Sequence, residues 1–178
     1  MNRQMKIGLA IISAILLIVC MKVIITELPK EIKNKEQITY NSMSIKTSLY
    51  IEGMESPRID VIEDLQGLYD YLYTFANDEL ELQFKKYYNS YFDDKVILVL
   101  TIQEGSSSID NNISDVIKTN SKTINIKVNR KVPQVGTDDM AMSHLIIEVD
   151  KKHMENIQKI LVNGKEVTIY NKQSYGFV

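Results

Sequence analysis

The sequence predicts an α+β protein, with an N-terminal transmembrane helix followed by a mainly antiparallel β domain with two helices packed on it. Three observations favour this fold class. An apolar run fills residues 7–25, two stretches with helical spacing lie between residues 65 and 91, and strand-like segments dominate after residue 95. The chain has 178 residues, 44% hydrophobic and 25% charged, which is globular composition and suits one domain.

The N-terminal run is long enough to cross a bilayer. From Ile7 to Ile25 it contains 19 residues, close to the roughly 20 that a transmembrane helix needs, and its one charged residue, Lys22, lies near the end. Arg3 and Lys6 precede the run, as in the positive region of a secretory signal. We therefore expect residues 1–26 to form a signal anchor that holds the protein in the cell membrane with a single pass.

Other interpretations of this run remain open. A cleaved signal peptide needs small residues at its cleavage site, and residues 19–23 contain none at the required spacing. Residues 17–20 are similar to a bacterial lipoprotein signal that would be lipidated at Cys20, although Val19 stands where a small residue is usual. A buried core helix is disfavoured because nothing polar marks a solvent face over three turns.

The two ends of the run favour opposite orientations. Arg3 and Lys6 favour a cytoplasmic N-terminus, because a basic start followed by one apolar run is typical of signal anchors. The positive-inside rule instead counts the lysines at the far end of the run and beyond it, namely Lys22, Lys30, Lys33 and Lys35. We expect the domain to lie on the extracytoplasmic side of the membrane.

After the anchor we expect a juxtamembrane stalk at residues 27–36, which is charged and poor in large apolar side chains. An extracytoplasmic α+β domain then fills residues 37–178. Strand-like segments rich in β-branched and aromatic residues open this domain at residues 38–40, 44–52 and 58–62.

Two helices are predicted next. Leucine and phenylalanine recur at helical spacing, and a second pattern of the same kind follows; the two sets are Leu65, Leu68, Leu72 and Phe75, then Leu80, Phe84, Tyr87 and Tyr91. Residues 76–78 suit a short connection between them, with a helix N-cap at Asn77 or Asp78.

The remainder of the domain is predicted to consist of strands. Residues 96–102 are almost continuously apolar, which indicates a central strand buried on both faces. Residues 113–119 and 123–129 read as a hairpin, and residues 145–149 as a further strand. Asn163-Gly164 between residues 157–162 and 166–170 is a strong hairpin signal.

Charge argues against a nucleic-acid partner. Residues 1–26 contain three basic side chains and no acidic ones, so the rest of the chain holds 18 basic and 23 acidic side chains. Phosphate binding needs a dense Lys and Arg footprint, which this acidic body does not have.

The sequence also predicts no enzyme, metal or cofactor site. It contains no Gly-rich phosphate loop, no G-x-S-x-G elbow and no H-E-x-x-H motif. Residues 110–121 begin like an EF-hand calcium loop but have Asp115 where glycine is required and Ser121 where glutamate is required. We expect His144 and His153 to be unpaired surface imidazoles, and a hydrolase would need His144 as its base.

Binding residues are expected at two places. Tyr69 and Tyr73 form an i, i+4 pair beside the first helical face, where they either complete the core boundary or offer a face to a protein or to wall glycans. The long polar connections at residues 105–112 and 133–143 are the other candidates, because binding residues concentrate on loops. In the second loop the apolar anchors would be Val135, Met140 and Met142.

Several motifs between residues 91 and 152 occur together in a known family. Tyr-Phe-Asp-Asp-Lys at 91–95 leads into the apolar strand, and the hairpin turn Asn120-Ser121 precedes the strand at 123–129. Pro-Gln-Val-Gly at 133–136 then precedes the strand at 145–149, which closes with Asp-Lys-Lys at 150–152. This order resembles the C-terminal domain of PrcB-type protease-complex subunits, small exported modules that accompany a surface protease.

The resemblance covers about a third of the chain and has two departures. Residues 105–110 read Gly-Ser-Ser-Ser-Ile-Asp where the family tends to have glycines and an aromatic residue, and His144 stands where a proline is often found. The resemblance implies a non-catalytic accessory module and transfers no catalytic residue. We therefore expect a membrane-anchored, extracytoplasmic interaction module that is accessory to a surface protease, the alternative being a cell-wall glycan-binding protein or lipoprotein.

Overall fold

The computed structural model describes residues 35–170 of the chain. The predicted anchor from Ile7 to Ile25 and all but the end of the predicted stalk lie outside the described residues. Within residues 35–170, no helix combines the length and the apolar character that crossing a membrane requires.

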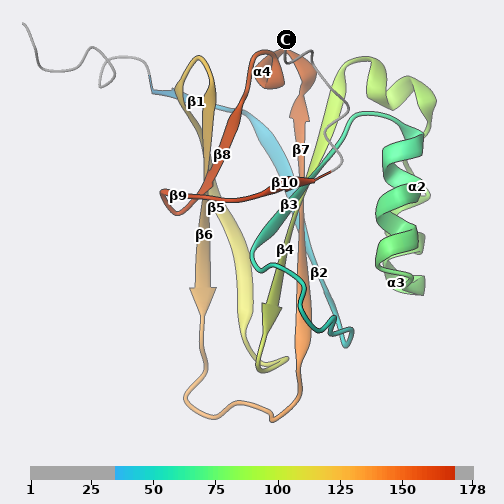
Figure 1. The fold of residues 1–178 in the computed structure, drawn as a ribbon, viewed down its shortest axis with the longest axis vertical. Helices are drawn as coiled ribbons and strands as arrows, with labels where there is room; N and C mark the ends of the chain where they lie inside the picture. Colours follow the sequence, from blue (N-terminus) through green and yellow to red (C-terminus); the bar gives the residue numbers. More distant parts are fainter. Residues whose placement is uncertain (1–34, 171–178) are drawn as a thin grey trace, which may run out of the picture. The chain divides into compact units, whose positions relative to one another are not determined.

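Two five-stranded sheets make up most of the described chain (Figure 1). Sheet A has the order β1–β5–β6–β8–β9, from β1 (Glu36–Gln37), β5 (Asp110–Asn120), β6 (Thr123–Lys131), β8 (Lys159–Val162) and β9 (Lys165–Glu166). Sheet B has the order β10–β3–β4–β7–β2, from β10 (Ile169–Tyr170), β3 (Arg58–Ile62), β4 (Lys95–Glu104), β7 (Ala141–Asp150) and β2 (Tyr40–Thr47).

Three helices accompany the sheets in the described residues: α2 (Leu65–Thr74), α3 (Asp78–Phe84) and the short α4 (Lys151–Met154). A 3-10 helix, η2 (Asn89–Asp93), leads into β4. This mainly β architecture with helices packed on sheets agrees with the predicted α+β class.

Strand β4 shows why the domain has three layers. It pairs with β3 on one side and along its whole length with β7 on the other, from Lys95↔Asp150 to Glu104↔Ala141. Side chains alternate across a strand, so its even-numbered residues join the core between the sheets, while Ile97 and Val99 join a second core beneath the helices. The prediction of a central strand buried on both faces is confirmed, because residues 96–100 have no exposed surface.

The second core fixes α2 and α3 on the outer face of sheet B (Figure 1). Tyr71, Phe75 and Phe84 supply its large rings and pack with Ile97 and Ile146 of the sheet. The tilted contact between the Tyr71 and Phe75 rings, 4.7 Å between centroids, is typical of packed aromatic pairs.

Local predictions agree closely with several elements. The strand expected at residues 58–62 has those bounds, and the expected hairpin through Asn120-Ser121 is formed by β5 and β6. Asn163 and Gly164 have φ angles of 50° and 84°, as a two-residue hairpin turn with positive φ requires, and they join β8 to β9. Not all pairing is antiparallel, since β10 runs parallel to β3 and β8 parallel to β6.

Several local predictions were wrong. The segment expected as one strand at residues 166–170 is divided between β9 of sheet A and β10 of sheet B, and residues 38 and 39 of the strand expected at 38–40 lie between β1 and β2. The strand expected at residues 44–52 ends at Thr47. The second helix ends at Phe84, so Tyr87 lies in the following turn and Tyr91 in η2, although both still face the aromatic core at helix-like spacing. His144 does not open its strand; it lies inside β7, which begins three residues earlier.

Candidate functional site

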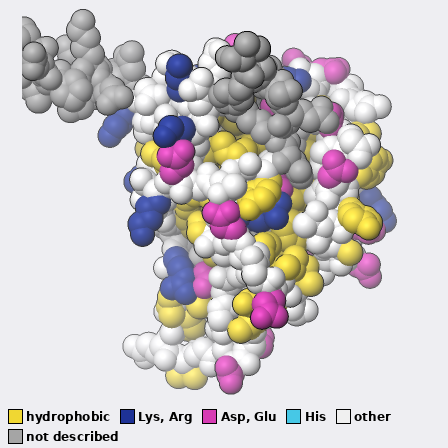
Figure 2. Space-filling view, viewed as in Figure 1, with side chains coloured by type: hydrophobic (Ala, Val, Ile, Leu, Met, Phe, Trp, Pro, Cys, Tyr) yellow, Lys and Arg dark blue, Asp and Glu magenta, His cyan; other side chains and the backbone are white. Residues whose placement is uncertain are grey.

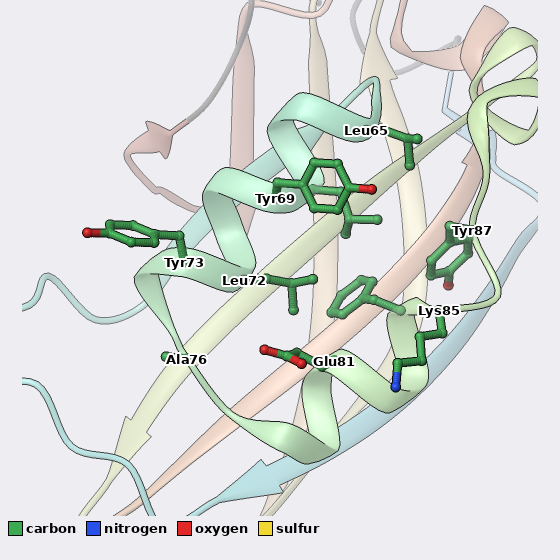
Figure 3. A pocket seen from close by; sticks show the side chains of 10 residues that line it. Leu65, Tyr69, Leu72, Tyr73, Ala76, Glu81, Lys85 and Tyr87 are labelled. Atoms are coloured by element: carbon green, nitrogen blue, oxygen red, sulfur yellow. The ribbon is translucent and has the colours of Figure 1, made fainter.

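A groove of about 590 Å³ lies along α2 and α3 (Figure 3). The α2 side and the connection to α3 provide mostly apolar and tyrosine side chains, and α3 and the following turn provide two charged residues and two rings. The lining residues are Leu65, Leu68, Tyr69, Leu72, Tyr73, Ala76, Glu81, Phe84, Lys85 and Tyr87.

The N-cap and the buried face of α2 set the position of its tyrosines. Asp64 caps the helix, its carboxylate accepting a hydrogen bond from the backbone N–H of Gly67 at 2.8 Å. Leu68 and Tyr71 are buried against sheet B, so the helix turns Tyr69 and Tyr73 outward, with 59% and 90% of their surface exposed. In Figure 3 the Tyr69 ring lies over the groove, whereas Tyr73 points away from it.

The opposite wall depends on the start of α3. The Asn77 side chain accepts hydrogen bonds from the backbone N–H groups of Glu79 and Leu80, which confirms the predicted cap. Leu80 and Phe84 are then buried, and Glu81 and Lys85 are the charged residues that line the groove on this side (Figure 3). The wall therefore presents one carboxylate and one ammonium group beside the apolar floor.

A polar contact fixes Tyr87 at one end of the groove. Its hydroxyl donates to Glu148 at 2.6 Å, and Lys86 donates to the same carboxylate at 2.9 Å. Burial, followed by the hydrogen bond and charge of Glu148, raises the pKa of Tyr87 well above its ordinary value. Burial raises the pKa of Glu148, but the hydrogen bonds from Tyr87 and Lys86 and the Lys86 charge hold it below its ordinary value.

The prediction that His144 is an unpaired surface imidazole was wrong. Its side chain has no exposed surface, its Nδ1 lies 2.6 Å from the Tyr71 hydroxyl, and its Nε2 lies 3.2 Å from the Thr47 hydroxyl. Desolvation lowers the pKa of His144 to about 4, so the ring is neutral at neutral pH. The physical reason is that β7 is covered on both faces, by sheet A and by the helices.

His153 is not an unpaired surface group either. Its side chain is 14% exposed, and its Nδ1 lies 3.5 Å from the Glu36 carboxylate of β1. The two imidazoles lie on different elements, β7 and α4, and each has partners of its own.

The second predicted binding place is a loop cluster at one end of the sheets. Both loops are shorter than predicted, because residues 110–112 belong to β5 and residues 141–143 to β7. The loops at 105–109 and 132–140 are held together by Thr137, whose hydroxyl lies 3.0 to 3.1 Å from those of Ser106, Ser107 and Ser108. Figure 1 shows the longer loop at the lower end of β6 and β7, away from α2 and α3. The structure therefore does not bring the predicted loop anchors together with Tyr69 and Tyr73.

The three loop anchors differ in exposure. Val135 is 86% exposed and Met140 is 52% exposed, so both are accessible to a partner. Met142 lies within β7 and has no exposed surface, because its side chain packs in the core beneath the helices. The interpretation of Met142 as a binding anchor was therefore wrong.

Among residues 35–170, no three His, Cys, Asp or Glu side chains are grouped as a metal ion would require. The EF-hand-like stretch from Asp110 to Asp115 lies within strand β5 and not in a loop. Sequence reasoning also missed the α3 side of the groove, Glu81 and Lys85, because only contact between the two helices makes them part of it.

A comparison with protein-family models, with curated proteins and with solved structures finds no significant match for this chain.

Proposed function

We propose that this protein is a membrane-anchored, extracytoplasmic and non-catalytic interaction module that binds a protein partner in the groove between α2 and α3. The observation that carries the proposal is the exposure of Tyr69 and Tyr73 beside an apolar floor. Tyrosine is enriched among the residues that dominate binding energies, because it combines a large apolar surface with a polar tip.

The groove has the features of a docking surface on a rigid support. Phe84 at its floor is 2% exposed and packs in the aromatic core, so the floor stays in place when a partner binds. Leu82 of α3 does not line the groove but is a further exposed apolar side chain of the same helix, at 63%. Single exposed apolar residues are ordinary, but a cluster of them marks an interaction site.

Accessory action toward a surface protease is the finer part of the proposal. This part is supported by the resemblance of residues 91–152 to PrcB-type subunits. The resemblance implies a module that accompanies a protease and contributes no catalytic residues. These residues supply the end of η2 and the strands β4, β5, β6 and β7, and α2 and α3 pack on sheet B, to which β4 and β7 belong. The groove itself lies outside the resembling stretch, so the partner surface would be specific to this chain.

Site-specific photocrosslinking tests the groove. A photoreactive phenylalanine analogue in place of Tyr69, in intact cells, should crosslink one discrete protein, because the ring lies over the groove. The same analogue at Tyr50, which is 46% exposed in the loop after β2, provides the control and should not capture that protein.

A glycan-binding function is the second candidate, favoured by the 90% exposure of the Tyr73 ring, which is free to stack on a sugar. No crosslink at Tyr69, combined with retention on purified cell wall that Tyr73→Ala abolishes, would contradict the protein-binding proposal and favour glycans. Equal crosslinking at Tyr69 and Tyr50 would likewise contradict it.

A further inference from the structure

Charge is unevenly distributed over the layers of the described domain. In the helical layer, residues 63–94 contain eight acidic and two basic side chains. The strands of sheet A and the β5–β6 turn show the opposite excess, with seven basic and four acidic side chains. The basic ones are Lys118, Lys122, Lys127, Arg130, Lys131, Lys159 and Lys165, and the acidic ones are Glu36, Asp110, Asp115 and Glu166. The acidic total of the chain therefore conceals a basic side.

Ion pairing increases this contrast. The carboxylates of Asp110 and Glu166 each pair with a lysine at 2.9 Å. Glu36 lies 3.5 Å from the His153 ring, so among the carboxylates of sheet A within residues 35–170 only Asp115 lacks a basic neighbour in an ion pair. Five lysines of the same part of the chain form no ion pair at all: Lys118, Lys122, Lys127, Lys131 and Lys165.

Several of these lysines lie on or beside the outer face of sheet A. The even-numbered residues of β6 join the core between the sheets, so Lys127 and Lys131 point to the opposite face. Lys122 in the turn before β6 and Lys165 in β9 are exposed beside this face. The helices of residues 35–170 make their main contacts with sheet B and leave this face uncovered. Figure 2 shows Lys and Arg side chains along the left flank, where Figure 1 places sheet A.

The outer face of sheet A is polar as well as basic. The exposed large apolar residues of the described chain lie in the helical layer and in loops, and none belongs to a strand of sheet A. The outward positions of β6 are all polar: Thr123, Asn125, Lys127, Asn129 and Lys131. Protein interfaces depend on apolar and aromatic anchors, whereas anionic lipid headgroups attract lysines on a polar surface.

We infer that the outer face of sheet A docks on anionic phospholipid headgroups; this rests on the membrane anchor of the proposed function. The described chain enters the domain through β1, an edge strand of this same sheet. Nine residues, 26–34, separate the predicted anchor from Lys35 and can span at most about 30 Å, so the bilayer surface is within reach of the face. Lysines within a Debye length of an anionic surface are attracted to it.

Docking through sheet A orients the groove. Sheet B and the helical layer follow sheet A in order, so α2 and α3 lie on the side of the domain that faces away from the lipid. The acidic residues between 63 and 94 are repelled by the same headgroups, which disfavours the reverse orientation. Tyr69 and Tyr73 then stay accessible to a partner.

Fluorescence quenching tests the inference on the full chain in nanodiscs. Asn129→Cys on the outer face of sheet A and Leu82→Cys on α3, each in a Cys20→Ser background, carry the same fluorophore, and the lipid headgroups carry a quencher. Replacing part of the phosphatidylcholine by phosphatidylglycerol should increase quenching at position 129 at least about twofold and leave position 82 unchanged. Added salt should remove the increase, because it screens surface charges.

Neutral variants then localise the effect. Lys127→Gln with Lys131→Gln should abolish the increase at position 129. Lys127→Arg with Lys131→Arg keeps the charge and should keep the increase, which separates loss of charge from a disturbed fold. The matched control, Lys85→Gln with Lys152→Gln, removes the same charge at exposed positions outside sheet A and should also keep the increase.

Equal quenching in the two lipid compositions would overturn the inference, and so would an equal increase at both reporter positions or the same loss in the control variant. Binding of soluble polyphosphate without any response to lipid would likewise overturn it and assign the face to a soluble polyanion. Failure of lipid docking leaves the proposed partner site standing when the analogue at Tyr69 still crosslinks a discrete protein. Failure of the full chain to enter nanodiscs would overturn the anchor and the inference together.

Discussion

His144 is held between two hydroxyl groups, those of Tyr71 and Thr47, and its ring packs edge-on against Phe75 at 5.2 Å between centroids. Protonation would give this buried ring a charge in an environment with no carboxylate among its hydrogen-bond partners. Tyr71 has a second partner, the Thr101 hydroxyl at 3.2 Å, so the imidazole belongs to a network that joins α2 to β2, β4 and β7. The tyrosine beneath the groove thus depends on a neutral histidine.

We predict that acid destabilises the domain through His144. Its folded-state pKa of about 4 lies below the ordinary value of 6.5, so the unfolded chain binds the proton more readily. The contribution of the neutral imidazole to the free energy of unfolding is complete above pH 6.5. It is lost as the pH falls from 6.5 to 4, and the loss amounts to about 3 kcal/mol. Urea unfolding of the full chain in detergent, followed by circular dichroism since there is no tryptophan, measures this change.

The comparison with His144→Phe isolates the histidine from the carboxylates that also titrate in acid. Between pH 6.5 and 4 the variant should lose about 3 kcal/mol less stability than the unmodified chain. His153→Gln is the matched control and should retain the steeper dependence. Parallel stability curves for His144→Phe and the unmodified chain would show that this imidazole is not the responsible group.

At the scale of elements, the junction between α2 and α3 determines whether the groove has two walls. Asn77 accepts hydrogen bonds from Glu79 and Leu80 at 3.0 and 3.2 Å, satisfying two backbone N–H groups at the start of a seven-residue helix. A helix this short depends on its cap and on packing, because isolated helices of this length are unstable.

We predict that Asn77→Ala lowers the free energy of unfolding by about 1 kcal/mol, the usual cost of losing an N-cap side chain. It should also weaken crosslinking from the photoreactive analogue at Tyr69, because α3 positions Glu81 and Lys85 on the opposite wall of the groove. Asn77→Asp, whose carboxylate can accept the same hydrogen bonds, should restore both properties, which urea unfolding and crosslinking in intact cells measure. An unchanged stability in Asn77→Ala would mean that packing alone fixes α3.

Elements with local signals could be predicted from the sequence, and those made by distant pairing could not. The Asn77 cap, the Asn163-Gly164 turn and the continuous apolar run of β4 each depend on neighbouring residues. The parallel pairing of Thr123 with Lys159 joins segments that no local pattern connects. Apolar alternation indicates that a strand has a buried face but does not specify which of two sheets contains it.

In the candidate site, too, the positions set by one helix could be predicted from the sequence, and those that depend on contacts between elements could not. Tyr69 and Tyr73 are an i, i+4 pair on one helix, so the sequence alone shows that they share a face. The contribution of Glu81 and Lys85 depends on contact between two helices, and the burial of His144 and Met142 depends on the layers on both sides of β7. No residue pattern within β7 distinguishes these positions from half-exposed ones.

At the scale of the whole molecule, the side of the membrane on which the domain lies decides which partners it can bind. Val135→Cys in a Cys20→Ser background places one thiol at an 86% exposed position, because Cys20 is the only cysteine in the chain. We predict that a membrane-impermeant maleimide labels this variant in intact cells. Labelling only after lysis would place the domain in the cytoplasm and contradict both the exported location and the protease-accessory role.

The route of the chain from β1 into β2 has a mechanical consequence. β1 pairs with two residues of β5 in sheet A, and after Ile38 the chain crosses into sheet B, where β2 pairs with β7 over eight residues. If the chain is anchored at its N-terminus and holds a partner on α2 and α3, as proposed above, tension between the two would run through β2, β7 and β4, strands of the sheet on which the helices pack. Beyond the short β1–β5 contact, sheet A lies outside this load path, so a pulled complex would strain one sheet while the other kept its shape.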